Sequence, residues 1–160
     1  MDALELLKQD HQKVKKLLTS ATETEDKKEQ KRLFREIRTE LETHARVEET
    51  IFYPAVQEHK ELASMVFESI EEHRQVKTLL RELSRATPGS DKFKAKLKVL
   101  NDDVKHHAEE EEEGKMFPKV RKAINSNELE VLGQEMEAAK QKRLRRATDA
   151  PRHEFRAGHS

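Results

Sequence analysis

The sequence predicts an all-α protein, an up-down-up-down four-helix bundle with an additional C-terminal helix. First, charged residues make up 40% of the 160-residue chain and aromatics 4%, with four Gly and four Pro, a mix that favours long helices over sheet. Second, apolar residues recur at alternating spacings of three and four, the period of one helical face. Third, a short stretch occurs twice, as HQKVKKLL at 11–18 and HRQVKTLL at 73–80, which indicates two similar halves.

The first two helices belong to the first half. The first is expected to start at Asp2, a suitable N-cap, and to run to about Ala21. Its apolar face consists of Leu4, Leu7, His11, Val14, Leu18 and Ala21. The second follows the polar turn TETEDKK, and Pro54 should kink or end it because proline lacks a backbone N–H. Its face consists of Phe34, Ile37, Leu41, His44, Glu48, Ile51 and Ala55.

The third helix is expected from about Glu61 to Ala86, and the fourth follows the loop TPGSD at 87–91. Their faces consist of Leu62, Val66, Ile70, His73, Val76, Leu80 and Leu83, and of Phe93, Leu97, Leu100, Val104, His107 and Glu111. His73 lies 14 residues before the loop begins, and His107 lies 16 residues after the loop ends. At a rise of about 1.5 Å per residue these offsets differ by only a few ångströms, so the histidines of the four helices should meet in one layer.

The chain is expected to divide into a bundle at 1–124, a C-terminal helix at 125–147 and a disordered tail at 148–160. The C-terminal helix has a thin apolar face of Leu129, Leu132 and Met136. Its basic end, KQKRLRR, is interpreted as a solvated helix end.

Composition limits the partners and the chemistry. Lys plus Arg and Asp plus Glu number 32 each, so no global charge attracts nucleic acid. No apolar run approaches the roughly 20 residues that span a bilayer, and the N-terminus MDALELLKQDH is unlike a signal peptide. The absence of cysteine excludes disulfides and thiolate metal sites. The protein is therefore expected in the cytoplasm, without a nucleic-acid or membrane partner.

Each predicted core helix has one histidine in its apolar face, and two of them add a glutamate four residues later. These residues are His11, His44 with Glu48, His73, and His107 with Glu111. One such histidine usually has a structural role, but four at one level with two carboxylates need compensation, because burying an unpaired carboxylate is costly. A metal supplies that compensation. Six ligands exceed what one tetrahedral zinc needs and suit a pair of ions, and nitrogen and oxygen donors favour iron, manganese or zinc.

The carboxylate of the fourth helix is ambiguous. The second-helix motif spans ten residues from histidine to proline (44–54), whereas the fourth-helix motif spans eleven (107–118). A single-residue π-bulge would absorb the extra residue, and such bulges often occur at functional sites. We favour Glu111 as the ligand, with Glu112 as the alternative if the bulge lies between it and the histidine.

Two further side chains near this constellation are assigned minor roles. His106 lies off the apolar face, so it is expected to support the ligands from outside or to face solvent. Tyr53 lies more than a helical turn beyond Glu48, so packing in the core or around the ligands is expected, with redox involvement a lesser alternative.

Four motifs carry a resemblance: DH at 10–11, HARVEETIFYP at 44–54, EEH at 71–73 and HHAEEEEEGKMFP at 106–118. On these motifs, which cover roughly residues 1–124, the sequence resembles the hemerythrin family, specifically the bacterial hemerythrin HHE cation-binding domain. The resemblance implies a four-helix bundle that holds an oxo- or hydroxo-bridged diiron centre. The ligand set itself also suits zinc or manganese. Carried over by position, it implies that His11, His44, His73 and His107 are terminal ligands and that Glu48 and Glu111 bridge the irons.

One departure from the oxygen-carrying hemerythrins affects the expected function. They have another histidine four residues after the third-helix histidine, where this chain has Lys77, so the site should be more open to solvent, peroxide or a further carboxylate. We expect a non-haem diiron protein that binds or senses dioxygen, nitric oxide or iron status, with a small diatomic ligand or peroxide as its partner. The alternatives are a diiron enzyme that decomposes hydrogen peroxide or nitric oxide, and a metal-independent helical interaction module.

Overall fold

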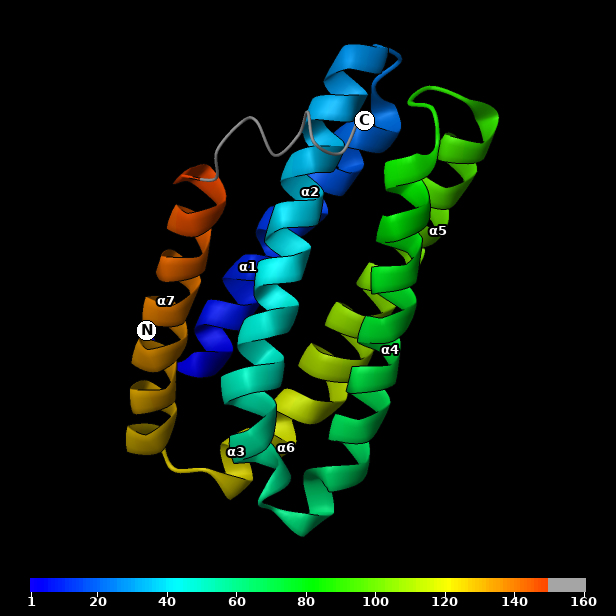
Figure 1. Cartoon of the computed structure of the whole chain (residues 1–160). Helices are drawn as coiled ribbons and strands as arrows, with labels where there is room; N and C mark the ends of the chain where they lie inside the picture. Colours follow the sequence, from blue (N-terminus) through cyan, green and yellow to red (C-terminus); the bar gives the residue numbers. More distant parts are fainter. Residues whose placement is uncertain (150–160) are drawn as a thin grey trace.

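The computed structural model describes residues 1–149 and, within them, confirms an all-α bundle with an additional C-terminal helix (Figure 1). In chain order its elements are α1 (Ala3–Glu23), α2 (Lys27–Val47), the π-helix η1 (Glu48–Phe52), α3 (Tyr53–Gln57), α4 (Lys60–Arg85), α5 (Asp91–Lys105), the π-helix η2 (His106–Met116), α6 (Phe117–Ala123) and α7 (Ser126–Asp149). The predicted disordered tail, 148–160, lies outside the described residues except for its first two positions, which are the last residues of α7.

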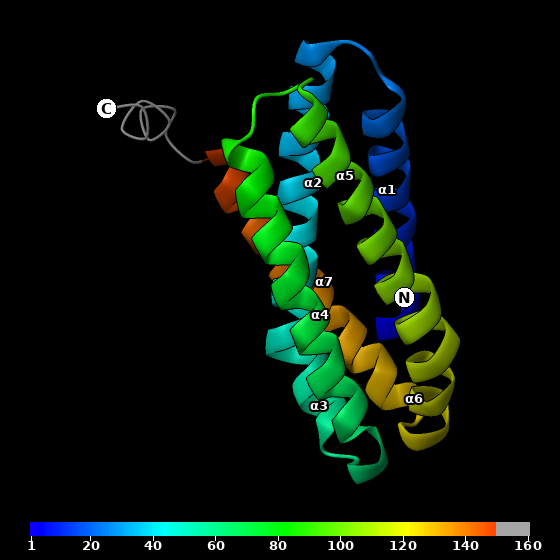
Figure 2. The same cartoon turned by 90° about the vertical axis from the view of Figure 1, so that its right-hand side faces the viewer.

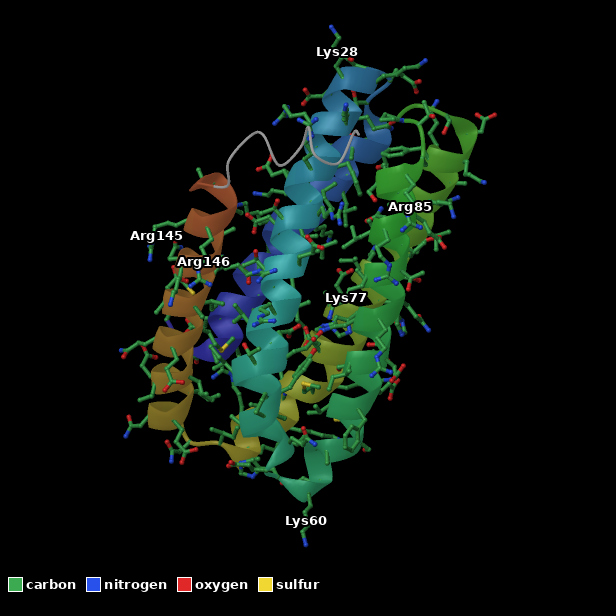
Figure 3. All side chains as sticks on the ribbon, in the orientation of Figure 1. Lys28, Lys60, Lys77, Arg85, Arg145 and Arg146 are labelled. Atoms are coloured by element: carbon green, nitrogen blue, oxygen red, sulfur yellow. The ribbon has the colours of Figure 1, made fainter. Side chains whose placement is uncertain are left out.

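The four bundle helices are α1, the continuous α2–η1–α3, α4, and the continuous α5–η2–α6 (Figure 2). Side chains cap the starts of α1 and α5. Asp2, the predicted N-cap, forms a capping box with Glu5 on α1, and Ser90 Oγ accepts a hydrogen bond from the N–H of Phe93 at the start of α5. The loop before α5 contains Gly89, whose φ of 81° lies in the left-handed region that favours glycine. Charged side chains cover the outside, and Lys28 and Lys60 extend from opposite ends of the molecule (Figure 3).

The hydrophobic interior is split into two cores along the bundle axis. One core lies near the chain ends of the bundle, where α1 begins and α6 ends. It includes Leu4, Leu7, Val47, Val66, Met116 and Phe117. The other lies toward the α1–α2 and α4–α5 turns and includes Val14, Leu18, Leu41, Leu80 and Leu100. On each bundle helix the histidine predicted as a ligand falls between residues of the two cores. The buried polar layer therefore separates two apolar layers, which exclude water from it on both sides.

Both proline-containing helices widen into a π-helix before the proline. The N–H of Tyr53 donates to Glu48 O, and the N–H of Phe117 donates to Glu112 O, a spacing of five residues in each case. Pro54 was expected to kink or end its helix. The helix does not end there but continues to Gln57, because the wider turn before the proline relieves the clash that an α-helical proline would cause. The irregularity predicted in the fourth helix is present but extends over 11 residues, and the one in the second helix was not predicted.

The C-terminal helix α7 lies beside α1 and α2, on the side away from α4 and α5 (Figure 1). Leu129 and Met136 are buried in the core near the chain ends, and Leu132 packs against it, as the thin apolar face predicts. Gly133 is also buried, against the backbone of the first three residues. Among residues 1–149, no helix is both long enough and apolar enough to cross a membrane.

Candidate metal centre

The four predicted histidines meet in the buried layer. The ring centroids of His11 and His44 are 5.0 Å apart, and those of His73 and His107 are 4.8 Å apart. All four side chains are at least nine-tenths buried. The expectation that helix counting places them at one level is therefore confirmed.

Every one of these imidazoles has a carboxylate on its Nδ1 atom. The pairs are His11 with Glu113 (2.6 Å), His44 with Asp10 (3.0 Å), His73 with Glu49 (2.6 Å) and His107 with Glu72 (2.6 Å). A carboxylate can only accept, so Nδ1–H donates in each pair and the tautomer is set. Nε2 of each ring then points inward, the orientation that carboxylate–histidine–metal arrangements use.

The inward nitrogens surround two carboxylates, Glu48 and Glu112, both with no exposed surface. Glu48 Oε1 lies 3.1 Å from Nε2 of His44 and 3.1 Å from Nε2 of His73. Glu112 Oε1 lies 3.0 Å from Nε2 of His11 and 3.5 Å from Nε2 of His107. Each carboxylate thus joins a histidine of one pair to a histidine of the other.

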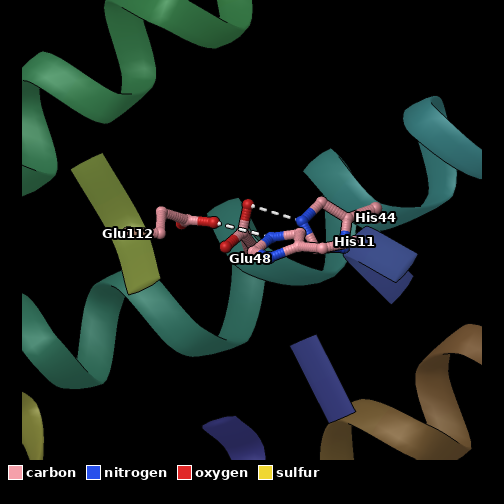
Figure 4. A group of neighbouring side chains, drawn as sticks. All are labelled: His11, His44, Glu48 and Glu112. Carbon is pink, nitrogen blue, oxygen red and sulfur yellow. Dashed lines mark hydrogen bonds and ion pairs between the residues drawn. The ribbon is translucent and has the colours of Figure 1, made fainter. Parts of the chain in front are cut away.

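The donor atoms form two groups that share a residue. His11, His44, Glu48 and Glu112 each offer an atom to one group (Figure 4), and Glu48, His73 and His107 form the second. Since Glu48 belongs to both and Glu112 also contacts both pairs of histidines, the geometry suits two neighbouring cations bridged by carboxylates. The chain is thereby equipped for metal binding.

The prediction that Glu111, rather than Glu112, is the carboxylate that joins the histidines is wrong. Glu111 lies outside the buried layer, and its Oε1 accepts a hydrogen bond from Lys115 at 3.1 Å. The reason is the π-helix: residues five apart share a face there, so Glu112, not Glu111, lies on the same side as His107. A signal was present in the sequence, because Glu48 and Glu112 each precede a proline by six residues. Counting back from the proline, rather than forward from the histidine, identifies the buried carboxylate.

The hydroxyl of Tyr53 lies among the predicted ligands, whereas packing in the core or around the ligands was expected. Its hydroxyl donates to Glu112 Oε2 at 2.6 Å and lies 3.2 Å from Glu48 Oε1, at 1% residue exposure. The same five-residue period brings Tyr53 back over Glu48, which an α-helical count does not. Burial, with the nearby Glu112 and Glu48 charges, holds its pKa well above the ordinary 10, so it remains a neutral hydrogen-bond donor.

Two other predicted residues flank the centre. His106 is half exposed, and its Nδ1 donates to Glu110 Oε2 at 2.5 Å, in agreement with its place off the apolar face. Lys77 donates to both oxygens of Glu49, at 3.0 and 3.1 Å, and Glu49 in turn holds His73. Lys77 thus bonds Glu49, the carboxylate that holds His73, and provides no metal ligand to the buried layer.

Without a metal, protons occupy the centre. Burial alone would lower the pKa of His107, but the surrounding carboxylates, chiefly Glu112, Glu48 and Glu72, raise it to about 10. The pKa of His44 is likewise raised well above its ordinary value, and that of Glu48 is held well below its own by the neighbouring imidazoles despite complete burial. Imidazoles that favour the protonated form therefore lie next to ionised carboxylates, as in a site where a metal ion takes the place of the protons.

Two buried atoms of the centre test whether a cation fits. Among the described residues, His44 Nε2 and Glu48 Oε2 have no hydrogen-bond partner, although His44 Nε2 lies 3.1 Å from the other oxygen of Glu48. A buried polar atom without a partner costs about 1–3 kcal/mol. Nε2 of His73 and of His107 also face each other at 3.1 Å, where at most one proton fits between them. A coordinated metal would satisfy all four atoms, so the residues fit it.

An apolar cavity of about 40 Å³ adjoins the histidines. Its lining includes all four imidazoles, the aliphatic side chains Val14, Leu41, Val76, Leu80 and Val104, and the charged residues Asp10, Glu42 and Lys77, although almost all of the surface exposed to the cavity is apolar. One water-sized probe occupies about 10–15 Å³, so the space admits a ligand of only a few atoms. The apolar walls favour an uncharged one.

The pKa shifts predict how pH affects the metal-free protein. A histidine whose folded pKa is about 10 and whose unfolded pKa is about 6.5 stabilises the fold fully below pH 6.5 and loses that contribution as pH rises toward 10. The Tm of chelator-treated protein should therefore fall across this range, whereas the rise in Tm caused by metal should grow, because metal and protons compete for the same nitrogens. Thermal melts with and without metal between pH 6 and 9.5 measure both. A flat metal-free profile, indistinguishable from that of His107→Gln, would contradict the assignment.

Comparison with known proteins gives a family and a structural neighbour. The hemerythrin HHE cation binding domain matches residues 2–120. The crystal structure of a hemerythrin HHE cation binding domain-containing protein from Mycobacterium kansasii, an Rv2633c homolog, is 28% identical in sequence, with a TM-score of 0.82 over 95% of both chains. That similarity extends beyond the four-helix bundle, since 95% of this chain must include much of α7.

Two relatives are similar along most of this chain. The uncharacterized protein Rv2633c of Mycobacterium tuberculosis is 30% identical over 139 residues, which are 86% of this chain and 84% of that protein. A DNA nickase of Nostoc sp. is 29% identical over 142 residues, which are 89% of this chain. This chain spans only 40% of the length of the nickase.

Proposed function

This chain belongs to the family of hemerythrin HHE cation-binding domains, and on that premise we propose that its buried layer holds two bridged iron ions that bind or sense dioxygen or nitric oxide. The observation that carries the proposal is the common orientation of the four imidazoles. Each is held at Nδ1 by a carboxylate and directs Nε2 at an oxygen of Glu48 or Glu112. Nitrogen and oxygen donors without sulfur suit iron, with manganese and zinc as the competing metals.

The residues divide into two sets of ligands. His11 and His44 would hold one ion, His73 and His107 the other, and Glu48 and Glu112 would bridge them. Bound iron would supply an open coordination position at which a small ligand binds. The two apolar cores keep bulk water from this layer, and the hydroxyl of Tyr53 fixes the orientation of Glu112.

The cavity supports a small uncharged ligand. It adjoins all four imidazoles, and its volume of about 40 Å³ is too small for a substrate of ordinary metabolite size. Dioxygen, nitric oxide and hydrogen peroxide all have this size and carry no charge. Binding or sensing one of them fits the space better than a role in storing or transporting a larger ligand.

Reconstitution with ferrous iron in air tests the proposal. We expect about two irons per chain and near-ultraviolet charge-transfer bands, both lost in His44→Ala. At 100 times Kd, a ligand that binds only the folded state stabilises it by about 2.7 kcal/mol. For a domain of this size that raises Tm by roughly 5–10 °C over chelator-treated protein. One zinc per chain would refute the diiron centre. No bound metal and an unchanged Tm would refute it as well and would favour a metal-independent interaction module.

One observation favours catalysis as the second candidate. Lys77, one helical turn beyond His73 on α4, also lines the cavity, but it is hydrogen-bonded to Glu49 and supplies no ligand. The His73–His107 group therefore has three ligand residues, against four in the His11–His44 group. An open position favours turnover of hydrogen peroxide or nitric oxide over reversible binding. Steady-state oxygen release from peroxide, compared between the iron-loaded protein and His107→Ala, separates the two. Equal rates would remove the catalytic candidate.

A further inference from the structure

We propose that Lys140, on the C-terminal helix α7, sets the metal affinity and reduction potential of the centre. It does so by partly neutralising the negative charge of Asp10, the carboxylate that accepts from His44 Nδ1. The inference rests on the proposed function, since it concerns the metal held there. It assigns a role in the centre to a helix that lies outside the four-helix bundle and outside the residues that match the family.

A continuous chain of contacts leads from α7 to the centre. Lys140 Nζ donates to Asp10 Oδ1 at 2.5 Å, and the other oxygen, Oδ2, accepts from His44 Nδ1 at 3.0 Å. Asp10 is only 4% exposed, and the lysine side chain 18%. Both charges are thus largely removed from water, where they act on each other and on the imidazole more strongly than at the surface.

The direction of the effect follows from this arrangement. A carboxylate that accepts from Nδ1–H makes the imidazole a stronger donor at Nε2, because negative charge shifts into the ring. A lysine on the other oxygen withdraws part of that charge and also adds a positive charge near the cations. Lys140 should therefore weaken metal binding and disfavour the oxidised state, which carries the larger positive charge.

Comparison of the four carboxylates shows that this compensation is selective. Asp10 is bonded by Lys140 and Glu49 by Lys77. Within residues 1–149, no lysine donates to either of the carboxylates behind the other two histidines, Glu72 and Glu113. In each pair of histidines, one carboxylate is therefore hydrogen-bonded by a lysine and one is not. The arrangement distributes the lysines evenly between the two metal positions.

The position of Lys140 is set by the packing of α7. Leu129 and Met136 anchor the helix in the core near the chain ends, and Gly133 lies against the backbone of the first residues. Lys140 is one turn beyond Met136 on the same face, which directs it at Asp10 on α1. The charge is thus held by a helix that contributes no metal ligand.

Four variants separate charge from packing. Lys140→Met and Lys140→Gln remove the charge, and the glutamine keeps a hydrogen-bond donor. Lys140→Arg keeps the charge, and Lys142→Met removes an exposed lysine two residues away on the same helix. The full chain is titrated with cobalt(II) alone, and the midpoint potential of the iron-loaded protein is measured in parallel.

Charge compensation predicts a gain of affinity. Both neutral variants should bind cobalt(II) about tenfold more tightly, within the range that changes around metal ligands produce. At a fixed potential their ratio of oxidised to reduced iron should rise about tenfold, which lowers the potential by about 59 mV per one-electron step. Lys140→Arg and Lys142→Met should stay close to the parent chain.

The opposite sign would overturn the proposal. If Lys140 only braces Asp10 and His44, the neutral variants should bind cobalt(II) more weakly, and unchanged affinity and potential would exclude any role. Equal effects of Lys140→Arg and Lys140→Met would assign the effect to packing. A parent chain that binds neither cobalt(II) nor iron would refute the proposed function itself, an outcome distinct from all of these.

Discussion

Replacing Glu112 with glutamine should strongly weaken metal binding at the centre, while Glu111→Gln should leave it intact. Glu112 has no exposed surface, and its Oε1 lies between the inward nitrogens of His11 and His107. Glutamine has nearly the same shape but no charge, so the bridge between the two metal positions would lose its anionic ligand. Glu111 instead bonds Lys115 at the surface.

The expected size of the effect is large. Removing a residue that only supports a metal ligand costs about 10–100-fold in affinity, so removing a bridging carboxylate should cost at least about 100-fold. Metal titration and iron stoichiometry of the two variants measure it, with circular dichroism to show that both remain folded. If Glu111→Gln loses metal and Glu112→Gln does not, the π-helical register described here is not the one that binds metal.

Gly133→Ala should destabilise the protein, although alanine ordinarily stabilises a helix interior by about 1 kcal/mol over glycine. A Cβ at this position would lie 2.4 Å from Met1 O, 2.7 Å from Asp2 C and 2.9 Å from Ala3 N. All three atoms belong to the backbone, so no side chain can move aside and α7 must shift away from α1. Overpacking of this kind costs about 1–3 kcal/mol, which should exceed the gain in helix propensity.

Equilibrium denaturation of Gly133→Ala measures this loss. Gln134→Ala, at the exposed neighbouring position, is the matched control and should stay within about 0.5 kcal/mol of the parent chain. A stabilised Gly133→Ala would mean that the close approach of α7 to the N-terminal residues does not exist in solution. The sign of the change, opposite to that expected from propensity, makes the test specific for this contact.

The helices and the level of the four histidines could be predicted because both depend on local periodicity. Spacings of three and four place Leu4, Leu7, Val14 and Leu18 on one face of α1, and Asp2 caps it. The rise per residue then sets the height of each histidine whatever its neighbours are. These properties require no knowledge of how the helices pack.

The register of the π-helices could be predicted only in part. The extra residue between histidine and proline indicated an irregularity, but Glu111 and Glu112 differ by one position within a run of glutamates. Which one is buried depends on where the wider turns lie, and a count forward from His107 at the α-helical period does not give their place. Tyr53 was misplaced for the same reason, since its return over Glu48 requires a five-residue turn.

By itself, then, the sequence determined an α-helical bundle with an additional C-terminal helix, and in it a layer of four histidines with an acidic residue from each of two helices. Only the tertiary structure decided that Asp10, Glu49, Glu72 and Glu113 hold those histidines and that Lys140 reaches Asp10 from α7. Each of these contacts joins side chains on different helices, up to 130 residues apart. Periodicity along one helix sets which way a side chain faces, but the rotation and offset of the neighbouring helices set what it meets.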